Sequence, residues 1–337
     1  MKKFIYILIF FVSSSFLYAK EVRKLVWPPP PDEARIEYVV SIKDYKDLGI
    51  EKGFFSKAFD FLFGEEDRPL HSPFGTHADG DRIYVTDIAY KEVYVFDKKK
   101  NKVITIKGSK KEEFIYPIDI VTDKSGNIYV SDSVGAKVFV FDTDGDFSYN
   151  ISFKELQRPV GLAVSADGQK LYIVDALSSQ IHVTTLKGKY LGIIGKKGNG
   201  DVEFNRPTFM DVGSDGKLYV SDSMNHRVQI LDKEGKFISK FGQLGQEIGS
   251  FGSPRGISVD SEGNIYVSDT MFNNMQIFNQ NGELLMVLGR YGDKKGEFSL
   301  PEDISITAND EIYMTDVNNK RLQVFKLIKR AQTRSLR

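Results

Sequence analysis

The chain has 337 residues, and its 46 basic and 46 acidic side chains give a formal net charge of zero. This balance excludes the overall positive field with which proteins attract nucleic acid, and we expect no nucleic-acid partner. The absence of cysteine excludes disulfides, thiolate-bound metals and covalently attached haem, and we expect no cofactor. The many aromatic residues, 25 Phe and 16 Tyr, favour a β-rich globular fold.

Residues 1–19 have the pattern of an export signal. Lys2 and Lys3 precede an apolar run, and the small residue Ala19 ends the segment. The apolar run of about 15 residues is shorter than the roughly 20 that a spanning helix needs, which favours cleavage after Ala19 over a retained anchor. The sequence therefore predicts a periplasmic or extracellular protein with no stable membrane span after signal cleavage.

Residues 20–34 form a proline-rich segment. The run Trp27-Pro28-Pro29-Pro30-Pro31 predicts a stiff polyproline II conformation, which serves either as a spacer or as a recognition element. Residues 35–42 follow it and alternate apolar and polar side chains over the length of one β-strand.

Residues 43–72 form an aromatic insertion. Phe55, Phe59 and Leu62 share one face of a short amphipathic helix that the spacing predicts. Two alternatives stay open for this insertion. Its phenylalanines either pack onto the rest of the protein or form an exposed apolar patch that binds a partner or a membrane surface.

A repeated pattern organises residues 73–325. Each of six copies has Ile or Leu, then Tyr, then two residues before an aspartate, and the copies are 43 to 47 residues apart. A proline lies 14 to 16 residues before each aspartate and opens an apolar stretch, as suits the first residue of a strand. Turn residues and two further alternating runs complete each copy. Each copy thus predicts a four-stranded antiparallel meander, which is one blade of a β-propeller. The six aspartates are Asp87, Asp132, Asp175, Asp222, Asp269 and Asp316.

The sixth copy supplies three strands and then enters the basic tail, residues 326–337. We expect residues 35–42 to provide the missing fourth strand, because that pairing would close the ring and remove the open sheet edges. The alternative is that residues 35–42 cap the outside of the propeller as an isolated strand.

These repeats resemble NHL repeats. The resemblance rests on the proline, the Ile/Leu-Tyr-Val-Ser/Thr-Asp pattern and the Asn-x-Arg sequence that follows it, most clearly in residues 221–230 and 315–324. It covers residues 73–325 and implies an all-β, six-bladed NHL-type propeller closed by an N-terminal strand. The family resemblance also implies recognition of another macromolecule, although some relatives are lyases that hold zinc through histidines.

Candidate binding residues lie where the six copies differ. The repeated aspartates are assigned to the framework, because a carboxylate at a strand end accepts N–H groups of the following turn in every blade. Two residues after the proline, three copies have glycine and the other three have Asp119, Phe209 and Asp303. We expect Asp211 and Glu302 in the same layer. Three arginines flank the prolines and predict alternating charge at the channel mouth, or simple solvated ion pairs: Arg158, Arg206 and Arg255.

The four histidines offer little for a metal site, which needs three ligands that converge. His77 lies beside the first inner strand and His226 lies in a loop, whereas His182 is expected to pack within a strand. We therefore expect no metal, and we keep His77 and His226 as candidate binding residues.

The sequence favours an exported binding or scaffold protein that recognises a protein or carbohydrate partner through a propeller face. One alternative is a metal-dependent lyase or hydrolase at the channel mouth, built on Asp119, Asp211, Asp303 and His77. Another is a haem-free structural subunit of an envelope electron-transfer assembly.

Overall fold

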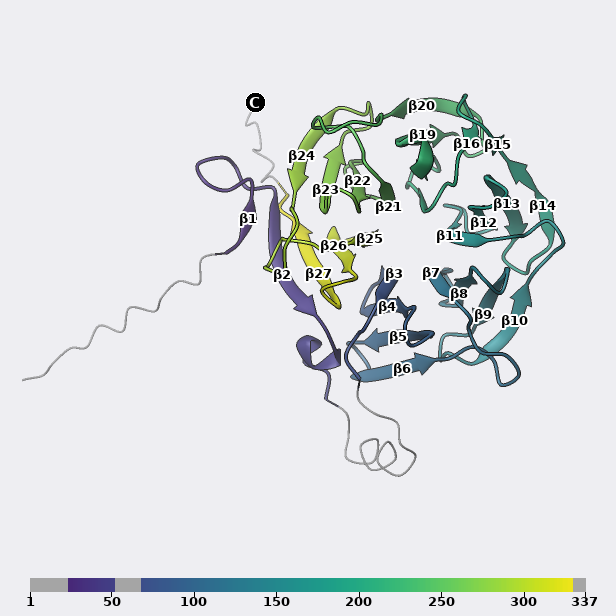
Figure 1. The fold of residues 1–337 in the computed structure, drawn as a ribbon. Coiled ribbons are helices and arrows are strands. Elements are labelled where there is room, and N and C mark those ends of the chain that lie inside the picture. The colour runs from purple at the N-terminus through teal and green to yellow at the C-terminus, as the bar shows by residue number, and fades with distance from the viewer. Residues whose placement is uncertain (1–23, 52–67, 330–337) are drawn as a thin grey trace, which may run out of the picture.

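The computed structural model describes residues 24–51 and 68–329, in which six sheets of four or five strands are arranged radially around a central axis (Figure 1). The predicted signal segment and the insertion residues Phe55 and Phe59 lie outside the described residues. In the described part of the chain, no helix has the length and hydropathy to cross a membrane.

Each blade is an antiparallel meander whose first strand lies innermost (Figure 1). Blade 1 contains β3 (Pro73–Asp79), β4 (Arg82–Asp87), β5 (Glu92–Asp97) and β6 (Lys102–Ile106). Blade 2 contains β7 (Pro117–Thr122), β8 (Ile128–Asp132), β9 (Lys137–Phe141) and β10 (Phe147–Ile151). Blade 3 contains β11 (Pro159–Val164), β12 (Lys170–Asp175), β13 (Gln180–Thr185) and β14 (Tyr190–Ile194).

The remaining blades follow the same order. Blade 4 contains β17 (Met210–Val212), β18 (Leu218–Asp222), β19 (Arg227–Leu231) and β20 (Phe237–Phe241), with the short helix η2 (Ser223–Asn225) between β18 and β19. Blade 5 contains β21 (Pro254–Val259), β22 (Ile265–Asp269), β23 (Asn274–Phe278) and β24 (Leu284–Leu288). Blade 6 contains β25 (Pro301–Ile306), β26 (Glu311–Asp316) and β27 (Arg321–Leu327), and a small parallel pair, β15 (Lys196–Lys197) and β16 (Glu203–Phe204), precedes blade 4.

The hydrophobic core is divided into wedges between neighbouring blades. Between blades 1 and 2, Phe114, Phe139 and Phe141 pack with aliphatic side chains such as Val95 and Ile120. The second strand of each blade is buried on both faces, whereas the fourth strand has exposed side chains. Each blade therefore buries its two faces against two neighbouring blades. Every blade has two such neighbours only when the ring is closed.

The ring closes as the sequence predicted. β2 (Ile36–Ile42) pairs antiparallel with β27, with Ile36 opposite Leu327 and Ile42 opposite Leu322 (Figure 1). The blade-6 strands continue to Leu327, two residues past the predicted repeat end.

The N-terminal segment adds a strand that the sequence did not predict. β1 (Val26–Trp27) pairs with the start of β2, and the Trp27 ring lies edge-on to Phe325 at 5.7 Å between centroids. The Arg35 N–H donates to the Trp27 carbonyl at 2.7 Å, so residues 28–34 form a loop. The prediction of an extended polyproline II segment was wrong, because the strand pairing turns the chain back on itself.

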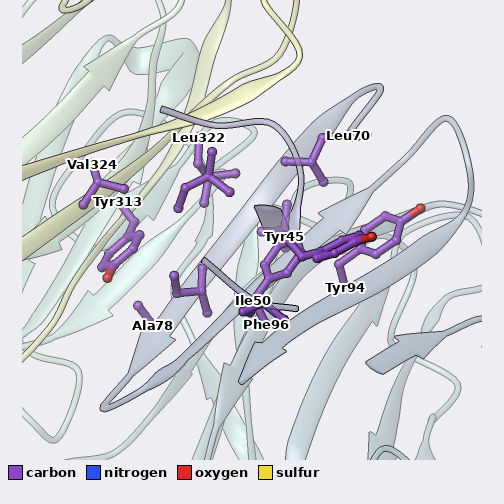
Figure 2. Close-up of a cluster of buried hydrophobic side chains, with 12 residues drawn as sticks. Tyr45, Ile50, Leu70, Ala78, Tyr94, Phe96, Tyr313, Leu322 and Val324 are labelled. Carbon is purple, nitrogen blue, oxygen red and sulfur yellow. The ribbon is translucent and has the colours of Figure 1, made fainter. Parts of the chain in front are cut away.

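The chain that follows β2 seals the seam between blades 6 and 1. The short helix η1 (Tyr45–Leu48) begins at Asp44, whose side chain accepts the Lys46 N–H. Figure 2 shows the cluster that this segment joins, in which N-terminal residues pack against side chains of β5, β26 and β27. The N-terminal contributors are Ile42, Tyr45, Ile50 and Leu70, and their partners include Tyr94, Phe96, Tyr313, Leu322 and Val324.

Candidate functional site in the central channel

The repeated aspartates are fully buried and hold the loops around them. Asp175 is an example: its carboxylate accepts N–H groups from Gln157 and Arg158 before the inner strand, and from Leu177 and Ser178 after the second strand. Burial opposes ionisation, but these bonds and the contact with His182 outweigh it and lower the pKa of Asp175 to about 2. The framework role predicted for these residues is confirmed, and it extends to the loop that enters each inner strand.

The inner strands leave two cavities along the channel. The first, of about 210 Å³, is lined by polar side chains that include His77, Asp119, Asp211 and Asp303. The second, of about 380 Å³, is lined by residues at the start of the inner strands and in the loops after the second strands. Phe209 lines both cavities, and its ring lies 6.4 Å from that of Phe74.

Three aspartates of the inner strands connect neighbouring blades; Asp119 and Asp303 are buried, and Asp211 is partly buried. Asp119 of blade 2 accepts the Leu162 N–H of blade 3 at 2.7 Å. Asp303 of blade 6 accepts the Thr76 N–H of blade 1 at 2.8 Å. Asp211 of blade 4 does the same for blade 5, through the Val259 N–H at 2.9 Å and the Ser258 hydroxyl at 3.0 Å. Each carboxylate also accepts the N–H of the next residue in its own strand. These contacts assign the aspartates to the framework of the ring.

The alternating glycines have a packing role. A Cβ added to Gly256 would lie 2.6 Å from the Cα of Asp303, and one added to Gly75 would lie 2.2 Å from the Ile118 carbonyl oxygen. The inner strands of blades 1, 3 and 5 therefore lie too close to the inner strand of the next blade for a side chain at this position, and the variation between copies reflects ring geometry.

Burial raises the pKa of all three aspartates. The pKa of Asp119 rises to about 7 through desolvation, with a further contribution from the charge of Asp211. Desolvation lowers the pKa of His77 to about 4, and the His77 Nε2 lies 3.0 Å from the Thr122 hydroxyl. The three aspartates and His77 line one cavity. Among the described residues, however, no three His, Asp or Glu side chains form a group that could hold a metal ion.

The second cavity, which we call the mouth cavity, gathers the predicted arginines. Arg158, Arg206 and Arg255 of blades 3, 4 and 5 line it together with Glu302 of blade 6. The expectation that Glu302 lies in one layer with Asp211 was wrong, because Asp211 lies four residues after its proline and reaches the other cavity, whereas Glu302 directly follows Pro301. Positive and negative groups therefore do not alternate around one mouth, and the arginines predominate in the mouth cavity.

Glu302 is the most unusual residue of the mouth cavity. Its side chain is 4% exposed, and its Oε2 lies 3.8 Å from the Arg255 Nε. Neither of these two atoms has a hydrogen-bond partner in the described protein. Burial raises the pKa of Glu302 to about 7, and the charge of Arg255 offsets only part of this shift.

We expect Glu302→Gln to be more stable than the wild type at neutral pH. The folded protein keeps the Glu302 proton up to its pKa of about 7, whereas the ordinary pKa is 4.5, so the wild-type free energy of unfolding falls as pH rises through this window. As pH rises from the ordinary pKa to the raised one, the free energy of unfolding of the variant should come to exceed that of the wild type by up to about 3 kcal/mol. Urea denaturation at pH 4, 6 and 8 measures the gain, and a pH-independent difference would contradict it. Glu234→Gln, at an exposed glutamate, is the control.

The loops that follow the second strands of four blades carry exposed apolar side chains that the sequence reasoning missed. They occupy the second position after the repeated aspartate in blades 2 to 5, and each is more than half exposed: Val134, Leu177, Met224 and Met271. The sequence carries a signal for these residues, because four copies have a larger apolar residue at this position, whereas blades 1 and 6 have Ala89 and Asn318 there. We call these four side chains the apolar arc. Leu177 and Met224 also line the mouth cavity.

The candidate His226 lies outside both cavities. It ends η2 with φ +53, and its Nδ1 lies 2.9 Å from the Gly252 carbonyl oxygen. His182 is buried and packs against Phe153 and Tyr190, as expected for a residue of a strand.

Comparison with known families agrees with this architecture. Residues 32–165 match a family model described as a 6-bladed beta-propeller, and residues 204–231, 251–278 and 298–325 match the NHL repeat. These matches identify NHL repeats and a six-bladed β-propeller model within this chain. No curated protein matches this propeller.

Solved structures resemble the NHL-repeat propeller in fold. A streptogramin B lyase is 14% identical, with 78% of this chain and 96% of that chain covered and a TM-score of 0.57. Virginiamycin B lyase from Staphylococcus aureus, solved with quinupristin, is 13% identical, with 76% and 95% covered and a TM-score of 0.58. An auxiliary nutrient binding protein from Bacteroides thetaiotaomicron is 12% identical, with 79% and 71% covered and a TM-score of 0.62. At these identities the likeness concerns the fold alone.

Proposed function

We propose that this propeller is an exported binding protein that recognises a protein partner through the face bearing the mouth cavity. The observation that carries the proposal is the apolar arc around an arginine-lined cavity. Isolated exposed apolar residues are common, but here four blades place one at the same repeat position. An apolar rim around a concave, charged centre is a surface that suits recognition.

The charge of this face supports an acidic partner. Arg206 is exposed and makes no ion pair within the described residues, and the Arg158 Nε contacts only the Ser133 hydroxyl, at 3.3 Å. Arginine is enriched in protein interfaces, where its planar group binds carboxylates through two hydrogen bonds. Structural neighbours include a nutrient binding protein as well as lyases, so the fold is compatible with a binding role.

A photo-cross-linking residue in place of Met224 tests this proposal in the native envelope. We expect it to capture one discrete partner about tenfold more efficiently than the same residue in place of Lys233. Met224 is 54% exposed in η2, which follows β18, whereas the Lys233 side chain is 73% exposed in the turn after β19, at the opposite end of the blade. Equal capture from both positions would contradict recognition through the mouth face.

A further inference from the structure

We infer that the mouth cavity binds the carboxyl terminus of a peptide chain that ends in an apolar residue. This inference rests on the proposed function and specifies which group of the partner enters the cavity. The cavity has arginines, an apolar wall and the buried Glu302. These three features would bind the carboxylate of such a terminus, its apolar side chain and the N–H of its last residue, respectively. The cavity volume of about 380 Å³ lies within the range of small-ligand sites, roughly 300 to 1,000 Å³.

The carboxylate would bind the arginines. Backbone contacts fix two of them: the Arg158 N–H donates to Asp175 at 3.2 Å, and the Arg206 N–H donates to the Ser179 hydroxyl at 3.3 Å. Arg206 has φ +47, so the chain there adopts a left-handed conformation that is uncommon for a side chain of this size. Charge-assisted bonds from guanidinium groups to a carboxylate are about twice as strong as neutral ones.

The apolar side chain would pack on the inner wall of the cavity. Phe74, Ile118, Val160 and Phe209 line it, and they come from the inner strands of blades 1, 2 and 3 and from the segment that precedes β17. Ile118 and Phe209 are buried, and Phe74 and Val160 are partly buried and pack against them. The cavity therefore offers an apolar wall beside its cationic groups, which an inorganic anion would not use.

The N–H would donate to Glu302. Glu302 lines the same cavity, and its buried Oε2 has no hydrogen-bond partner in the described protein, whereas buried polar atoms of native proteins are nearly always paired. The opposing Arg255 Nε is equally unpaired at 3.8 Å. A simple anion would bind the arginines and would have no use for Glu302 as an acceptor. A peptide terminus has an N–H donor next to its carboxylate, and this donor can bind Glu302.

Titration calorimetry with N-acetyl-phenylalanine tests the inference on the full protein. This probe carries the free carboxylate, an aromatic side chain and one amide N–H. We expect saturable binding that falls about tenfold when the carboxylate is replaced by an amide, and about tenfold in Arg206→Gln. Lys233→Gln, on the opposite face, should bind as the wild type does. Thermal unfolding of Arg206→Gln checks that this exposed substitution leaves the fold intact.

Other ligands define the results that would overturn the inference. Glucuronate or inorganic phosphate binding as tightly as N-acetyl-phenylalanine would show that the cavity selects a sugar acid or a simple anion. Undiminished binding of the amidated probe would remove the role of the carboxylate. Failure of all probes while Met224 still cross-links its partner would refute the carboxyl-terminus assignment but leave partner recognition standing. Probe binding without any cross-link from Met224 would refute the proposed protein partner instead.

Discussion

Ile42→Asp is expected to lower the free energy of unfolding by more than about 4 kcal/mol, which is a large part of the roughly 5 to 15 kcal/mol that stabilises a typical folded domain. Ile42 is the last residue of β2, is fully buried and packs in the cluster that joins blades 6 and 1. A carboxylate at this position would lose its hydration without gaining a partner. Since β2 pairs with β27, the same change weakens the closure of the ring.

Val39→Asp is the matched control in the same strand. Val39 is 48% exposed and lies at the irregularity in the pairing of β2 with β27. Its replacement should change stability by less than about 0.5 kcal/mol, as is usual for exposed positions. Urea denaturation of both variants measures the difference. Equal stability of the two variants would mean that β2 does not hold the ring closed.

Asp175→Ala is expected to lower the free energy of unfolding by about 3 to 5 kcal/mol, because it leaves four backbone N–H groups without their acceptor. Two of these groups belong to Arg158 and Leu177, which line the mouth cavity. The substitution should therefore weaken N-acetyl-phenylalanine binding as well as stability. Asp144→Ala is the control, because Asp144 is exposed, has only a 3.8 Å contact with Lys100 and should cost less than about 0.5 kcal/mol.

Acid should reduce the difference between Asp175→Ala and the wild type. The pKa of Asp175 is about 2 in the folded protein and 3.8 ordinarily, so its stabilisation is complete above pH 4 and is lost as pH falls toward 2. The difference in free energy of unfolding between the wild type and the variant should shrink by about 2 kcal/mol across this pH range. A deficit that stays constant from pH 5 to pH 2 would show that the charge of Asp175 is not what holds the two loops.

The fold was predictable because its information is repeated. Six copies of one pattern define the blades, and a copy lacking one strand points to the segment that completes it. The strand at Val26 and Trp27 was not predictable, since two residues carry no periodicity. Its position depends on the contact of Trp27 with Phe325, which only the closed ring brings together.

The candidate site was predictable only in part. The sequence identified the aspartates, Glu302 and the arginines, but it could not assign them to cavities. One residue along an inner strand moves a side chain from one cavity to the other, because Glu302 lines the mouth cavity and Asp303 lines the first cavity. The role of the aspartates also depends on contacts between blades, such as that of Asp119 with the Leu162 N–H, which no spacing within one repeat reveals.

The pairing of β2 with β27 also sets the order of events in folding. β2 is synthesised before any blade, whereas its partner β27 is synthesised after the other strands of all six blades. Until then Tyr38 and Ile42 have no native neighbours in blade 6, and blade 1 lacks one of its two flanking blades. Joining ends so far apart in the chain is slow, and the waiting strand is open to association with other chains. We therefore expect ring closure to be a late step of folding, in which the unpaired β2 favours aggregation.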